Sequence, residues 1–160
     1  MSDRPDVQII KPLNTLLKAK TGSGRVTPDL EAIERAEEAI KTIGDDFANW
    51  AQSDLDELDK ALAAARTNPD RQEDYITQIF RRAMELKGQG GSFGYDLISQ
   101  VGESLKISTE TRSEANPRDV ETIAAHVDAM RVVMVDDIKG DGGDVGRAIV
   151  DGLYKLTTGS

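Results

Sequence analysis

The helical spacing of the apolar residues, divided into segments by three capping signals, limits the folds open to this chain more than any other feature. Each signal is a Thr or Asn followed by a proline suited to the first helical position, and acidic residues occupy the turn that follows. The three signals are Thr27-Pro28, Asn68-Pro69 and Asn116-Pro117. No stretch shows the sustained alternation of a strand. We therefore predict an all-α fold, an antiparallel four-helix bundle with additional N- and C-terminal segments.

The apolar stripes place the individual helices. They predict helices over residues 28–43, 45–66, 69–88, 94–105, 117–138 and, with a weaker pattern, 143–156. The first two are separated at Gly44, and the polar stretch 106–116 is predicted to be a loop. This organisation divides the chain into an N-terminal extension (1–26), a helical bundle (27–138) and a C-terminal helical extension (139–160).

Composition excludes several kinds of chemistry. The 160 residues include no Cys and a single His, His126. Zinc fingers, iron–sulfur clusters and disulfide frameworks need thiols, and a two-His metal site needs a second imidazole. No apolar run approaches the roughly 20 residues that span a bilayer, and no signal-peptide pattern opens the chain. We expect a soluble, cytoplasmic protein without a metal site or a cofactor.

The charge balance is acidic and uneven. The chain has 20 Lys and Arg against 29 Asp and Glu, a net charge of −9. Residues 1–26 have five basic and two acidic side chains, so the remainder is the more acidic part. Nucleic acids and anionic membranes attract clustered cations and repel such a body. We expect neither as a partner, and we interpret the basic arm as a simple extension.

The most distinctive segment, AMELKGQGGSFG, runs from Ala83 to Gly94 and has four glycines in its last seven residues. It follows a predicted helix and lacks the Gly-Lys-Ser/Thr ending of a phosphate-binding loop. The segment resembles the signature of histidine-containing phosphotransfer (HPt) domains. In that family the phosphorylated helix carries Ala-His-x-Leu-Lys-Gly, followed by small residues and another helix. The matching positions here are Ala83, Leu86, Lys87 and Gly88.

The resemblance extends over the bundle, although its specific part covers only about 80–105. It implies a monomeric four-helix bundle in bacterial two-component signalling, with a receiver domain or a histidine kinase as partner. The chain departs from the family at the phosphoacceptor position, where Met84 replaces the histidine. A thioether cannot form the phosphoramidate that an imidazole forms. We therefore expect no enzyme activity. We expect the protein to bind a receiver domain or a histidine kinase and thereby to modulate a phosphorelay.

The resemblance also indicates a docking face. Met84 lies about 100° from the centre of its apolar stripe, which places it on the flank of the helix. Lys87 and Gly88 follow it by three and four residues and share its face. In the family that lysine supports the phosphoryl group and that glycine leaves room for the receiver. The predicted docking residues are Arg81, Met84, Glu85, Lys87, Gly88 and Gln89. An ordinary solvated helix face is the alternative for the charged residues.

Two alternative functions remain open. Phosphotransfer could use His126, which lies near the edge of an apolar stripe and lacks a following Leu-Lys-Gly; a locally hydrogen-bonded structural histidine is the simpler interpretation. The bundle could also be a structural or adaptor protein without a receiver partner.

Other acidic groups indicate no site. The acidic loop that contains Asp136, Asp137, Asp141 and Asp144 does not fit a calcium-binding frame, so we predict a plain turn. The acidic pairs Glu37-Glu38 and Asp45-Asp46 are expected to face solvent.

Overall fold

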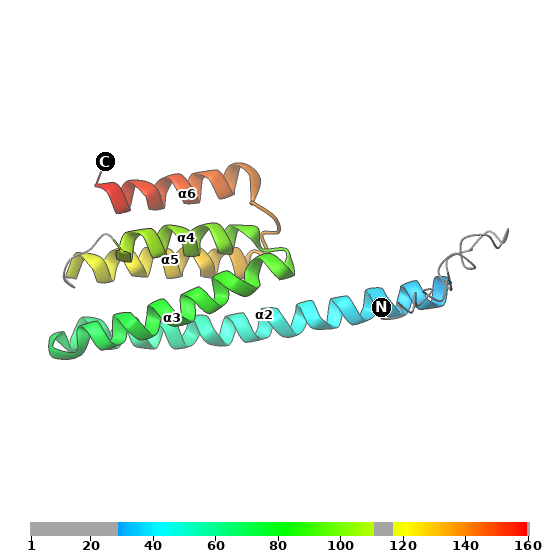
Figure 1. Cartoon of the computed structure of the whole chain (residues 1–160), viewed down its shortest axis with the longest axis horizontal. Helices are drawn as coiled ribbons and strands as arrows, with labels where there is room; N and C mark the ends of the chain where they lie inside the picture. Colours follow the sequence, from blue (N-terminus) through cyan, green and yellow to red (C-terminus); the bar gives the residue numbers. More distant parts are fainter. Residues whose placement is uncertain (1–28, 111–116, 160) are drawn as a thin grey trace, which may run out of the picture. The chain divides into compact units, whose positions relative to one another are not determined.

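A computed structural model describes residues 29–110 and 117–159 (Figure 1). The chain divides into two compact units, residues 1–37 and 38–160, and the packing reported below is that of the second unit. All regular elements of the described ranges are helical, which confirms the predicted all-α class at that level. The elements are α2 (Leu30–Thr67), η1 (Pro69–Arg71), α3 (Gln72–Gly90), η2 (Gly91–Phe93), α4 (Asp96–Glu110), α5 (Pro117–Val135) and α6 (Gly143–Thr158).

The helix boundaries correct the sequence prediction in three places, of which the smallest is the end of α5 at Val135 where the prediction was 138. Residues 30–67 form one helix that passes through Gly44, where two helices were predicted. A glycine inside a helix costs only about 1 kcal/mol relative to Ala, less than interrupting a helix whose apolar spacing continues on both sides. Likewise, α4 continues to Glu110 beyond its predicted end at 105. The C-terminal helix predicted over 143–156 is present as α6.

The capping signals have mixed outcomes. Thr27-Pro28 and Asn116 lie outside the described residues. Asn68 was predicted to cap the helix that follows it, but its side chain makes no such bond. Its amide nitrogen donates instead to the Ala64 carbonyl, at 2.9 Å, and so completes the end of α2. Pro69 then begins the short turn η1 that leads into α3.

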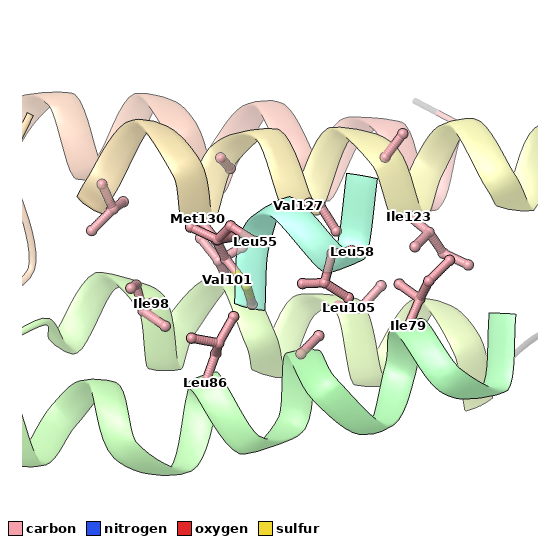
Figure 2. Packing of buried hydrophobic residues seen from close by; sticks show 14 of the residues in the cluster. Leu55, Leu58, Ile79, Leu86, Ile98, Val101, Leu105, Ile123, Val127 and Met130 are labelled. Carbon is pink, nitrogen blue, oxygen red and sulfur yellow. The ribbon is translucent and has the colours of Figure 1, made fainter. Parts of the chain in front are cut away.

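The core of the second unit is built from α2, α3, α4 and α5. Figure 2 shows side chains from these helices converging on one another, and they are fully or almost fully buried. The labelled residues are Leu55, Leu58, Ile79, Leu86, Ile98, Val101, Leu105, Ile123, Val127 and Met130. α3 packs on α4, α4 on α5, and α6 lies along α4 and α5. The motif helix α3 is therefore fixed to its neighbours by its apolar stripe.

Two segments far apart in sequence are joined at one end of this unit. The Gly94 backbone has φ +81°, a conformation that favours glycine. Its carbonyl accepts a hydrogen bond from Gly140 at 2.7 Å, and the Gly140 carbonyl accepts one from Leu97 at 2.9 Å. The Tyr95 hydroxyl donates to Asp137 Oδ1 at 2.6 Å. The corner between α3 and α4 thus holds the connection between α5 and α6.

Of the helices in the described ranges, none combines the length and the apolar character that crossing a membrane would require.

Candidate docking face on α3

The apolar stripe of α3 determines where the motif residues lie. Ile76, Ile79, Ala83 and Leu86 are buried against the core. The predicted docking residues then divide into two groups by exposure. Arg81, Glu85, Gly88 and Gln89 are exposed, whereas Met84 and Lys87 are half-buried. Met84 packs against the edge of the core, as its position on the flank of the stripe predicts.

Lys87 is held against α4. Its ammonium forms an ion pair with Glu103, and its backbone carbonyl accepts a hydrogen bond from Ser99 Oγ at 2.9 Å. The aliphatic part of Lys87 passes close over Gly102, where an added Cβ would lie 2.6 Å from Lys87 Cβ. The hydrogen bond from Lys87 is the main cause of a lowered pKa at the Glu103 carboxyl. Glu103 on α4 therefore partly neutralises the basic spot that was predicted around Lys87. The sequence of α3 alone could not indicate this pairing.

Gly88 lies beside open space. No atom of its surroundings lies within 4 Å of the place where its Cβ would be. Within the part of the chain that the structure describes, nothing therefore requires a glycine there for packing, and a glycine inside a helix is unfavourable by about 1 kcal/mol relative to Ala. A molecule that approached α3 here could come close to its backbone. Arg81 lies on the same side, about two turns from Gly88.

Arg82 has a structural role that the sequence analysis missed. Its Nη1 donates to Asp54 Oδ1 at 2.8 Å, and Asp54 is buried on α2. The other carboxylate oxygen, Oδ2, is buried and accepts no hydrogen bond. Asp54 lies inside the apolar stripe of α2, and that placement was the available signal for a buried ion pair. Of the two adjacent arginines, Arg82 is thus structural and Arg81 is free to face a partner.

His126 is completely buried between α4 and α5, and not at the edge of its stripe as predicted. Its Nδ1 lies 2.7 Å from the Thr122 carbonyl, which can only accept, so Nδ1 carries the proton. Nε2 lies 2.9 Å from Ser104 Oγ and accepts from that hydroxyl. Burial lowers the pKa of His126, opposed in part by the Thr122 hydrogen bond. The local hydrogen bond predicted for this histidine is confirmed, and both ring nitrogens are occupied.

The acidic groups set aside in the sequence have partners or face solvent. Asp137 accepts a hydrogen bond from the Tyr95 hydroxyl, and Asp141 Oδ1 accepts one from the Gly143 backbone N–H at 2.9 Å. Asp144 forms an ion pair with Arg147. Glu37-Glu38 and Asp45-Asp46 are exposed, as predicted. Within the described ranges, no three His, Asp or Glu side chains are grouped so that they could hold a metal ion.

Comparison of the chain with models of protein families, with curated proteins and with solved structures finds no match.

Proposed function

We propose that residues 27–138 form an HPt-like four-helix bundle, made by α2 to α5, that binds a receiver domain or a histidine kinase through the α3 face around Met84. The C-terminal helix α6 is an addition to this bundle. The protein acts in the cytoplasm as a monomeric modulator of a bacterial-type phosphorelay. It competes with a genuine relay component for the shared partner and passes on no phosphoryl group.

The combination of Met84 and Gly88 on one accessible flank of α3 is the observation that carries this proposal. The face has a half-buried apolar centre, open space above Gly88, and the exposed guanidinium of Arg81. Interfaces commonly have such an apolar centre within a polar rim. Arg81 suits the carboxylate-rich pocket of a receiver, because opposite charges favour encounter and orientation.

The geometry of His126 weighs against the alternative of phosphotransfer through that residue. A phosphoacceptor nitrogen must be reached by the phosphoryl donor of another protein. His126 has no exposed surface and both of its nitrogens make hydrogen bonds inside the unit. Phosphorylation there would require α4 and α5 to separate.

The test restores the missing imidazole. We expect Met84→His to acquire acid-labile phosphohistidine from phosphorylated receivers or an active kinase of the source organism, with labelled phosphate as the readout. The wild-type chain should bind the same partner and remain unlabelled. Transfer to Met84→His should fall when Gly88→Leu is added, because the new side chain would occupy the open space. The matched control is Gly152→Leu, the same substitution at an exposed position of α6 that also has nothing within 4 Å of its Cβ.

Three results would contradict the proposal. Label on the wild-type chain that disappears in His126→Ala would favour the relocated acceptor. Failure of Met84→His with every receiver, together with no binding by wild type, would favour an adaptor without receiver partners. Equal loss of transfer in the Gly88→Leu and Gly152→Leu backgrounds would show that the partner does not use the Met84 face.

A further inference from the structure

The apolar stripe of α2 continues beyond the elements that cover it. From Phe47 onward the stripe is buried, whereas Ile40 and Ile43 are 70% and 54% exposed. These residues, with Gly44 and Ala48, keep the spacing of one helix face. The stripe therefore ends in two turns of uncovered apolar surface within the second unit.

This uncovered part forms one wall of a cleft. The cleft has a volume of about 810 Å³ and lies between α2 and the corner that joins α3 to α4. Ile40, Ile43 and Ala48 line it from α2, and Phe93 and Met134 line it from η2 and α5. The Phe93 ring is fixed, because it stacks on Phe47 with ring centroids 4.3 Å apart. The cleft thus has a rigid floor and an exposed aliphatic wall.

Gly44 leaves the middle of this wall open. No atom lies within 4 Å of the place where its Cβ would be, and its backbone lines the cleft. Most residues would stabilise the helix relative to glycine. The space that this glycine leaves is used by nothing in the second unit, and it would let another backbone approach α2 closely.

We propose that this cleft binds an amphipathic, positively charged helix of a partner protein. A helix is the occupant that matches the wall, because residues 40, 43, 44 and 48 offer one helical ridge that continues the internal packing of α2. The positive charge follows from the surroundings. Residues 38–160 contain 23 Asp and Glu against 14 Lys and Arg. Such a field attracts basic segments and repels acidic ones.

Two lysines, Lys41 and Lys139, and two carboxylates, Asp45 and Asp137, line the cleft, so the preference for a positively charged occupant rests on the acidic surroundings and not on the lining alone. The Nζ of Lys139 lies 3.6 Å from the centre of the Tyr95 ring and 3.1 Å from Asp137 Oδ1. Its charge is therefore offset locally. Asp45 is exposed on the α2 wall, where it can pair with a Lys or Arg on the flank of the incoming helix. This inference concerns a different surface from the α3 face and does not depend on the proposed function.

The experiment uses the full chain and a blocked synthetic peptide of about 15 residues, made only of Leu and Lys with Leu at helical spacing. Two comparison peptides separate the contributions: one has the same composition in scrambled order, and the other has Glu in place of Lys. At about 0.15 M salt, where exposed charges are screened beyond roughly 8 Å, we expect the basic amphipathic peptide to bind at least about tenfold more tightly than either. Isothermal titration calorimetry measures the affinities.

Variants locate the binding. Gly44→Leu fills the open space and should fold, since nothing lies near the new side chain. Ile43→Glu places a charge on the wall. Each should weaken binding by about tenfold or more, the size expected when an anchor in an apolar interface is lost. Leu156→Glu is the matched control, an equally exposed leucine on α6, and should change the affinity by less than about twofold.

Several outcomes would overturn the inference. Equal binding of the scrambled peptide would reduce the interaction to non-specific charge attraction. Unchanged affinity in Gly44→Leu and Ile43→Glu, or no binding at all, would remove the cleft as a site. Sedimentation that shows a wild-type dimer and an Ile43→Glu monomer would make a second copy the occupant. Peptide binding that appears only after deletion of residues 1–26 would make the occupant a segment of this chain.

Discussion

At the scale of single residues, the buried polar side chains have the largest consequences. His126 is neutral in the folded chain, with its proton on Nδ1, because burial disfavours the charged imidazolium and lowers its pKa. The unfolded chain exposes the same imidazole to water, where it titrates near 6.5. Folding stability therefore depends on pH through this imidazole in a range above the ordinary pKa of carboxylates.

The first prediction concerns that pH dependence. The pKa of His126 is lowered in the folded state, so its contribution to stability is complete above about pH 6.5 and decreases as the pH falls toward the folded pKa. We expect the free energy of unfolding to fall by up to about 1.4 kcal/mol per pH unit between pH 6.5 and 5. Urea unfolding at several pH values measures it. His126→Gln, which cannot titrate, should lose this slope, and parallel slopes in the two proteins would contradict the assignment.

The second prediction concerns the two adjacent arginines of α3. Arg82→Ala removes the guanidinium that pairs with the buried Asp54 carboxylate, while Arg81→Ala changes an exposed position. The Arg82 side chain is 39% exposed, so water partly screens its ion pair with Asp54. We therefore expect Arg82→Ala to destabilise the fold by about 2 kcal/mol, less than the loss of a fully buried pair would. Arg81→Ala should lie within about 0.5 kcal/mol of wild type. Similar values for the two variants would show that water replaces the guanidinium without cost.

At the scale of elements, α3 and α4 approach each other closely at two glycines, Gly90 and Gly102. Our third prediction is that Gly102→Ala destabilises the fold by about 1–3 kcal/mol, because the new methyl group would overlap the stem of Lys87 and push the two helices apart. Gly88→Ala is the comparison, since its Cβ would meet no atom within 4 Å. It should be neutral or stabilise α3 by up to about 1 kcal/mol. Thermal unfolding of both variants measures the difference, and an equally tolerated Gly102→Ala would contradict this packing.

Element type could be predicted from the sequence, whereas the partners of individual side chains could not. Helical spacing is a local property, so the helices appear close to their predicted places. Gly44 was misread because the cost of a helical glycine is small compared with the packing on either side of it. Asn68 was misassigned because the same side chain can serve the end of one helix or the start of the next. The pairing of Lys87 with Glu103 and of His126 with Ser104 depends on how helices cross, which one-dimensional spacing does not contain.

At the scale of the whole molecule, the second unit is closed by contacts between distant parts of the chain. The Gly140 N–H donates to the Gly94 carbonyl across 45 intervening residues, and the Tyr95 hydroxyl donates to Asp137 beside them. α6 follows directly after this junction. The attachment of α6 to α4 therefore depends on the corner between α3 and α4 as well as on its own buried Leu153.

The fourth prediction tests this junction. Tyr95→Phe keeps the buried ring and removes the hydroxyl that donates a hydrogen bond to Asp137. Because the Asp137 side chain is 68% exposed, we expect a loss of only about 1 kcal/mol, with faster hydrogen exchange at the Leu97 and Gly140 amides. Tyr154→Phe, at an exposed position on α6, should change neither quantity. Unchanged exchange in Tyr95→Phe would show that the backbone bonds alone hold the junction.

The aromatic cluster at this end of the unit also determines what optical spectroscopy can observe. Trp50 is the sole tryptophan of the chain, half-buried, with its ring centroid 5.8 Å from that of Phe47. Intrinsic fluorescence therefore reports the surroundings of α2 beside the cleft and is nearly blind to α6. Circular dichroism, by contrast, weights every helix by its length. A difference between unfolding curves recorded by the two methods would identify which end of the chain loses its structure first.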